Sequence, residues 1–124
     1  MDDLALGLFP DFKGARTVLL CCTKRGIEQL RQLVGSAAQG RVAVHSYAMV
    51  APNHPVKLFC GADVAEDGFT WLVSADRVAV IDAALGALSE VPGGHQCFEL
   101  ANGASAQLMV SAGEYDTAWW ATHA

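Results

Sequence analysis

A strand, a helix and a β-hairpin follow one another within residues 69–116, and this succession constrains the fold more than any other part of the sequence. The short apolar run Phe69–Val73 is rich in β-forming residues and predicts a strand. Ser74 is suited to cap a helix, and Asp76 would lie near the positive end of the helix dipole. Because four apolar residues then fall on one helix face, we expect a helix over residues 75–90: Val78, Ile81, Leu85 and Leu88.

Turn-forming residues predict the hairpin that follows this helix. The segment Val91-Pro92-Gly93-Gly94 ends the helix, and residues 95–100 and 106–111 are expected to be strands. Asn102-Gly103 lies between them, and both residues tolerate the positive φ of a tight hairpin turn.

The same order of elements occurs once before, in residues 17–63. A shift of 51 residues places Thr23 on Ser74 and superimposes an expected helix at 24–38 on the one at 75–90. Helix-face residues coincide under this shift, Leu30 with Ile81 and Val34 with Leu85, and the earlier unit contains three expected strands, Thr17–Cys22, Arg41–Val44 and Val56–Cys60. The pattern predicts a tandem βαββ repeat with units 17–63 and 69–116, although a generic rhythm of strands and helices produces the same pattern without duplication.

We therefore expect an α+β fold in a single domain, residues 1–124. Both helices have one apolar stripe, which suits a two-layer sandwich of about six mostly antiparallel strands with two helices on one face. The composition, 52% hydrophobic and 17% charged, is that of a chain that buries a packed core.

The flanking segments are less constrained. Residues 1–16 contain alternating apolar residues and predict either a short extra strand or a packed tail. The strand at 41–50 can continue past His45 and Tyr47, and a final strand can cover 117–121.

Charge and hydropathy narrow the classes of partner and the location. A net charge of −5 argues against a broad nucleic-acid or anionic-membrane surface and is compatible with a basic protein partner. No apolar run reaches the roughly eighteen residues that a membrane span needs, and the start is acidic rather than basic as in a signal peptide. The expected location is the cytoplasm.

The cysteines and histidines do not form a metal motif. Cys21, Cys22, Cys60 and Cys97 lie in expected strands among apolar neighbours, as buried cysteines do in a reducing compartment. A zinc site from His45, His54 and Cys60 would lack the closely spaced ligand pair of zinc motifs. We expect no metal and no cofactor.

Enzymatic alternatives rest on isolated residues. His95 follows two glycines and could act as a general base, and Cys97 or Cys60 could pair with a histidine at a sheet edge. Apolar surroundings raise a thiol pKa and disfavour the reactive thiolate. Lys24-Arg25 lies where a strand meets a helix, a place suited to anions, but lacks the glycine-rich loop of nucleotide sites. No residue is therefore assigned a catalytic role.

Two acidic segments and a pair of tryptophans form the candidate partner-binding set. Loop 61–68 carries clustered carboxylates, and a comparable acidic segment follows the second hairpin, close to an aromatic pair suited to anchor a partner. In an extended segment one tryptophan of the pair would face outward; alternatively both close the core. The two segments could lie together or at opposite ends of the molecule. The candidate residues are Asp63, Glu66, Asp67, Glu114, Tyr115, Asp116, Trp119 and Trp120.

The second half resembles a known family. Its strand and helix leading to Gly94-His95-Gln96, and its ending Val110-Ser111-Ala112-Gly113-Glu114-Tyr115, are similar to small bacterial immunity proteins of polymorphic toxin systems. The resemblance covers about half of the chain. It implies a partner-binding role in toxin neutralisation and transfers no functional residue. The first half departs from it, with Gly40-Arg41 and Gly61-Ala62-Asp63 at the corresponding places.

The leading hypothesis is a non-enzymatic protein-binding protein, an immunity protein that neutralises a bacterial toxin with a basic domain. The alternatives are a small enzyme that uses a Cys/His pair at a sheet edge, and a self-associating structural module such as a homodimer.

Overall fold

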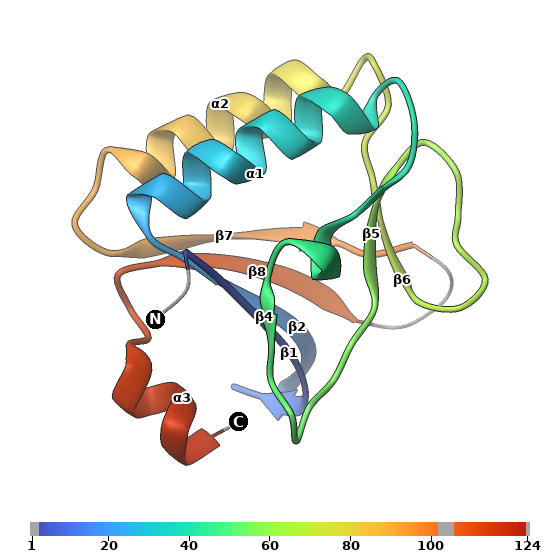
Figure 1. Cartoon of the computed structure of the whole chain (residues 1–124). Coiled ribbons are helices and arrows are strands. Elements are labelled where there is room, and N and C mark those ends of the chain that lie inside the picture. The colour runs from blue at the N-terminus through green and yellow to red at the C-terminus, as the bar shows by residue number, and fades with distance from the viewer. Residues whose placement is uncertain (1–2, 102–105, 124) are drawn as a thin grey trace.

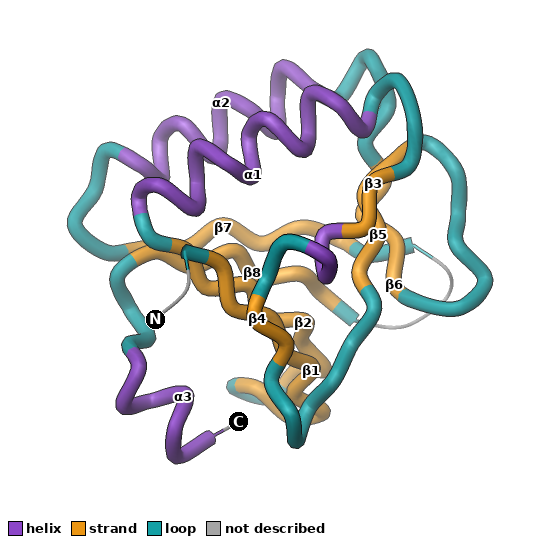
Figure 2. The backbone as a smooth tube through the Cα atoms, viewed as in Figure 1, coloured by secondary structure: helices purple, strands orange, loops and turns teal. Residues whose placement is uncertain are grey.

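The computed structural model describes residues 3–101 and 106–123. Its strands and helices follow the chain in this order: β1 (Leu4–Phe12), β2 (Ala15–Cys22), α1 (Lys24–Ala37), β3 (Val42–Ala43), the 3₁₀ helix η1 (Val44–Ser46), β4 (Met49–Val50), β5 (Leu58–Gly61), β6 (Phe69–Leu72), α2 (Val78–Ser89), β7 (Gly94–Glu99), β8 (Gln107–Ala112) and α3 (Thr117–His123). Helices α1 and α2 lie side by side over the larger sheet, and α3 lies on the opposite side of that sheet (Figures 1 and 2). The expected α+β class is confirmed.

The described strands form two mixed sheets rather than one largely antiparallel sheet. The larger sheet has the order β4-β1-β2-β8-β7, and the smaller has the order β3-β5-β6. Of the six strand pairings, β1–β2, β3–β5 and β7–β8 are antiparallel, whereas β1–β4, β2–β8 and β5–β6 are parallel. The expectation of a single, mostly antiparallel sheet was wrong. Strand β2 pairs with the distant strand β8 and not with the strands that follow α1.

The N-terminal segment is a full strand, not a packed tail. Strand β1 runs antiparallel to β2, with Leu4 opposite Cys22 and Leu8 opposite Val18. The connecting turn places Lys13 at φ 52° and Gly14 at φ 88°, a left-handed conformation that glycine adopts without strain.

Helix α1 begins as the sequence predicts. The hydroxyl of Thr23 accepts a hydrogen bond from the Gly26 N–H at 3.0 Å and donates one to the Asp3 carboxylate at 2.8 Å. Glycine is needed at position 26 because a Cβ there would lie 2.0 Å from the Asp3 carbonyl oxygen. The cap therefore joins the helix to the start of β1.

Helix α2 begins later than expected, at Val78. Ser74 does not cap it with its side chain, because its hydroxyl is hydrogen-bonded to the Asp76 carboxylate. The Ser74 carbonyl accepts from the Arg77 and Val78 N–H groups, so residues 75–77 form a turn that leads into the helix.

The expected strand over residues 41–50 is present only in part, as β3 and β4, and the possible final strand over residues 117–121 is wrong. The strand from Arg41 ends at Ala43, and η1 follows because the ring of His45 folds back, its Nδ1 accepting from the Leu58 N–H at 3.2 Å. Segment 117–121 belongs to a helix, whose first turn is capped by Asp116 accepting from the Trp119 N–H at 2.9 Å. The expected Asn102-Gly103 turn lies outside the described residues.

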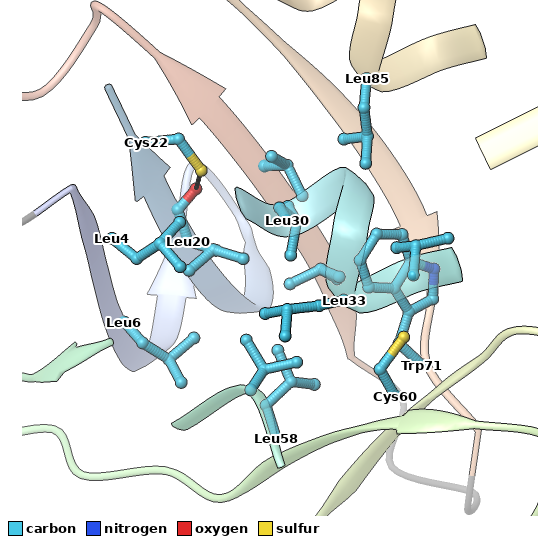
Figure 3. Close-up of a cluster of buried hydrophobic side chains, with 14 of the residues drawn as sticks. Leu4, Leu6, Leu20, Cys22, Leu30, Leu33, Leu58, Cys60, Trp71 and Leu85 are labelled. Carbon is cyan, nitrogen blue, oxygen red and sulfur yellow. Dashed lines mark hydrogen bonds between the residues drawn. The ribbon is translucent and has the colours of Figure 1, made fainter. Parts of the chain in front are cut away.

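Two hydrophobic clusters hold these layers together. The main cluster lies between the helices and both sheets and includes Leu20, Leu30, Leu58, Trp71 and Leu85, which point toward one another (Figure 3). The second cluster fills the space between the larger sheet and α3, and comprises Ala5, Phe9, Phe12, Leu19, Cys21, Ala51, Met109 and Trp120. Within the described residues, no helix is long and apolar enough to cross a membrane.

Leu30 and Ile81 are buried at the centres of the inward faces of α1 and α2. Truncating either side chain to alanine is expected to lower the free energy of unfolding by about 2–5 kcal/mol, because a cavity remains between the helices and the sheets. Urea denaturation measures this loss. Exposed Gln32→Ala on α1 is the control and should leave the midpoint almost unchanged; equal midpoints for all three variants would contradict the assigned packing.

Candidate partner-binding surface

The candidate partner-binding residues lie at two separate places. Asp63, Glu66 and Asp67 are in the loop between β5 and β6, beside the smaller sheet. The C-terminal members lie in and before α3, on the far side of the larger sheet (Figure 1). The two acidic segments are therefore at opposite ends of the molecule and do not form one continuous surface.

The β5–β6 loop is anchored from beneath and carries its charges outward. The Ala65 N–H donates to the hydroxyl of buried Thr70 at 2.8 Å, which ties the loop to β6. The carboxylates of Asp63 and Glu66 belong to exposed residues. Asp67 pairs with Lys57 at 3.3 Å, and this hydrogen bond lowers the Asp67 pKa. The loop presents negative charge partly offset by one lysine.

Glu114 is part of a polar cluster at the end of the β7–β8 hairpin. Its Oε1 accepts from the Ser111 hydroxyl at 2.7 Å and lies 3.0 Å from His95 Nδ1. Burial acts to raise the Glu114 pKa, but the hydrogen bonds from Ser111 and His95 outweigh it and lower that pKa. Glu114 thus remains a carboxylate to lower pH than a free glutamate.

Helix α3 separates the roles of the two tryptophans. Trp120 is buried on the larger sheet in the second hydrophobic cluster, where it packs as a core residue. Trp119 is half-buried, stacks on His123 at 4.3 Å between ring centroids and lies 4.7 Å from the Tyr115 ring. The helix explains this outcome, because adjacent residues point about 100° apart rather than to opposite faces.

We name the aromatic surface for the rings that continue from the sheet onto α3: Phe12, Tyr115, Trp119 and His123. The Tyr115 ring lies 5.7 Å from Phe12, so β1 supports the start of this surface. Lys13 Nζ lies 5.8 Å from the Tyr115 ring centroid, within the range of a cation–π contact.

An indentation of about 280 Å³ adjoins the aromatic surface. It opens between the start of α1 and the segment after β8, with Lys24 on one side and Glu114, Tyr115 and Asp116 on the other. Pro92 and Val91 supply apolar wall. The indentation therefore combines carboxylates, an aromatic ring and apolar surface, which suits a long basic side chain.

His95 has a carboxylate partner that the sequence did not identify. The β7–β8 register places His95 opposite Ser111. Glu114 lies three residues after Ser111, beyond a turn in which Gly113 has a φ of 73°. The Ser111 hydroxyl directs its proton to Glu114 rather than to the imidazole. The cluster orients His95 and does not reproduce a serine nucleophile activated by histidine.

The cysteines are in surroundings that disfavour the thiolate. Burial raises the pKa of Cys21 and of Cys60 to about 12, and it also raises the pKa of Cys22. Cys97 is exposed on β7 near His95, and its pKa is raised first by burial and then by the Glu114 charge. A Cys/His nucleophile requires the opposite shift.

No group of three or more potential ligands among His, Cys, Asp and Glu gathers in the described parts of the chain. His45 is hydrogen-bonded to the Leu58 backbone, and His54 packs on Phe9 at 4.7 Å between ring centroids. Arg25 at the start of α1 lies 3.9 Å from the Asp3 carboxylate.

Comparison with known protein families, curated proteins and solved structures gives no match for this chain.

Cys97 should be the fastest-reacting cysteine, since the other three are buried. Its raised pKa leaves less thiolate at neutral pH than in a free thiol. We therefore expect the alkylation rate of Cys97 to climb with pH to a midpoint above that of a model thiol, as measured by iodoacetamide labelling and peptide mass spectrometry. Cys97→Ser controls for labelling of buried sites, and a midpoint below that of the model thiol would favour the enzymatic alternative.

Proposed function

We propose that this chain is a non-enzymatic protein-binding protein, an immunity protein that neutralises a toxin through the surface around α3. The observation that carries this proposal is the indentation beside the aromatic surface, flanked by Glu114 and Asp116. A basic segment of the partner would place an arginine or lysine there and cover Tyr115 and Trp119. The net charge of −5 supports a basic partner.

Each residue type has a distinct part in such binding. Carboxylates attract a basic partner during approach and speed association, while a half-buried tryptophan becomes fully desolvated in the complex and slows dissociation. Tyr115 and Trp119 are held by neighbouring rings, so ordering them on binding costs little side-chain entropy.

The β5–β6 loop is not part of this footprint, because it lies at the other end of the molecule. Salt screens interactions between exposed charges over about 8–10 Å, so these carboxylates should contribute less to association at α3 than Glu114 and Asp116 do. The loop is therefore the natural internal control for charge effects at α3.

The first test uses a partner identified by coexpression with neighbouring genes or by affinity purification from the native host. Trp119→Ala should increase the dissociation rate by about tenfold or more, measured by surface plasmon resonance. Tyr47→Ala removes an exposed aromatic residue outside the aromatic surface and should leave the rate unchanged. Similar rates for wild type and Trp119→Ala would remove α3 from the interface.

A charge test uses two matched neutralisations. Asp116→Asn keeps an acceptor for the α3 cap but loses the charge, so it should lower the association rate and weaken its dependence on salt. Asp63→Asn makes the same change in the β5–β6 loop and should have little effect. Equal effects of the two variants would point to overall charge rather than this surface.

We also propose that the fold arose by tandem duplication of a βαββ unit. Strand exchange supports this: β2 from the first unit joins the β7–β8 hairpin of the second, and β6 from the second joins β3–β5 of the first. Val18 lies opposite Leu108 and Phe69 lies opposite Leu58, so these two parallel registers agree with the 51-residue shift to within one residue. Each half thus completes the sheet of the other, as in a fused dimer.

The contact between the helices supports the same origin. Arg31 donates two hydrogen bonds to the Asp82 carboxylate, at 2.8 and 3.0 Å, and the two residues are 51 positions apart. That spacing equals the shift that superimposes the units, so equivalent positions touch each other. On a twofold axis a residue meets its own counterpart, and in this chain the two counterparts carry opposite charges. The pair lowers the pKa of Asp82.

Exchanging these charges tests the equivalence. Arg31→Asp alone should destabilise the fold, because two carboxylates would face each other across the helices. Adding Asp82→Arg should recover most of the loss, with a coupling of about 0.2–1 kcal/mol for this partly exposed pair. Denaturant unfolding of the wild type, both single variants and the double variant gives the coupling. If the double variant is no more stable than the sum of the two single-variant losses predicts, the two side chains are not coupled. That result would count against equivalent positions.

A further inference from the structure

Strand β7 is the longest strand at a sheet edge in the described chain. It ends the five-stranded sheet and has six residues, whereas the other edge strands are β4 and β3 with two each and β6 with four. His95, Cys97 and Glu99 alternate with half-buried residues and are exposed. The strand contains no proline and no lysine, the residues that commonly protect an open edge.

Helix α2 exposes an apolar stripe. Val80 is 71% exposed and Val91, just beyond the helix end, is 40% exposed. Ala84 and Ala87 lie between them at helical spacing. Helices at a protein surface usually carry polar residues on the outer side, so an exposed apolar stripe on α2 is unusual.

The stripe and the open edge lie on the same side of the molecule. Asp82 faces α1, where it pairs with Arg31, and Ile81 and Leu85 face the core. At about 100° per residue, the stripe centred on Ala84 and Ala87 points away from α1. Since α2 contacts β7, this direction is the outer side of β7 (Figure 1).

We propose that two copies of this chain associate through β7 and α2 in a twofold-symmetric dimer. The two β7 strands pair antiparallel and join the five-stranded sheets into one continuous sheet. A twofold axis perpendicular to that sheet brings both α2 helices to the same face, where their apolar stripes pack against each other. One symmetry operation thus covers both the edge and the stripe.

The sequence of β7 is complementary to itself in this arrangement. With the axis at Cys97, His95 of one copy lies opposite Glu99 of the other, and Cys97 lies opposite its own counterpart. His95 contacts Glu114 through Nδ1, which leaves Nε2 for the facing Glu99 carboxylate. Directly opposed residues have Cα atoms about 4.5–5.5 Å apart, within the span that a disulfide bridges.

The dimer leaves the proposed partner surface open. Helix α3 lies on the other face of the five-stranded sheet, and the β5–β6 loop lies beside the smaller sheet (Figure 1). Loss of dimerisation and loss of toxin binding are therefore separable outcomes.

Mass measurement over a dilution series tests the dimer. Light scattering coupled to size exclusion should give twice the chain mass for the wild type. Val80→Glu places a charge in the α2 contact and should raise the dimer dissociation constant by at least about tenfold. Val64→Glu introduces the same residue at another exposed valine, 48% exposed in the β5–β6 loop, and should leave the mass unchanged.

Cross-linking tests the register. Oxidised glutathione should oxidise the two facing Cys97 thiols by thiol–disulfide exchange, releasing two reduced glutathione molecules and leaving a disulfide-linked dimer, and Cys97→Ser should lose it. The control is Cys97→Ser combined with Ala62→Cys, which moves the exposed thiol to the β5–β6 loop and should not cross-link at the same rate.

The proposal is overturned if the wild type stays monomeric at the highest concentration, which would assign the edge to another occupant. It is equally overturned if Val80→Glu and Val64→Glu weaken the dimer alike, or if the displaced thiol cross-links as fast as Cys97. Unchanged unfolding midpoints for both glutamate variants would show that the mass reports association rather than misfolding.

Discussion

The pairing of β2 with β8 is the interaction on which the rest of the structure depends. It is parallel and runs in register from Thr17 opposite Gln107 to Cys22 opposite Ala112. Both strands are buried on both faces, by the main cluster on one side and the second cluster on the other. Parallel strands need a long connection, and here the whole of α1, the smaller sheet and α2 form it. Every element except β1 and α3 therefore lies between two strands that hydrogen-bond to each other.

This arrangement makes the two halves of the chain inseparable. Leu20 of β2 and Trp71 of β6 point into the same main cluster from different sheets (Figure 3). A fragment that contained only one unit would lack a partner strand for its hairpin and would expose its helix face. Stability is therefore a property of the complete chain, in which α1 contacts α2 and both sheets share one core.

Local signals in the sequence predicted local structure well. Thr23 caps α1 as expected because its hydroxyl and the amphipathic helix belong to one short segment. Ser74 has the corresponding position before α2, but its hydroxyl is hydrogen-bonded to Asp76 instead of capping the helix. Residue type alone does not decide between these two hydrogen bonds. The partner of each strand could not be predicted, because the apolar pattern of a strand does not specify which other strand it pairs with.

The candidate site shows the same limit. The aromatic and acidic residues near the C-terminus were identified, but a pair of adjacent tryptophans fits a strand and a helix equally, and only the cap at Asp116 distinguishes them. The contact of His95 with Glu114 was missed because it depends on cross-strand register and on the Gly113 turn. The two acidic segments are separate because one lies in the β5–β6 loop of the smaller sheet and the other follows β8 of the larger sheet.

The late pairing of β2 with β8 also has a consequence for synthesis on the ribosome. Gln107 bonds to Thr17 across 90 residues of chain, so β2 emerges long before its neighbour β8 exists. At ordinary translation rates of about 5–20 residues per second, the β1–β2 pair waits on the order of ten seconds with one edge unpaired. During that interval β2 has an apolar strand edge without its β8 partner, and such transiently exposed edges are prone to aggregation. The larger sheet is completed only after β8 has been synthesised, so its correct assembly depends on this edge of β2 remaining unpaired until then.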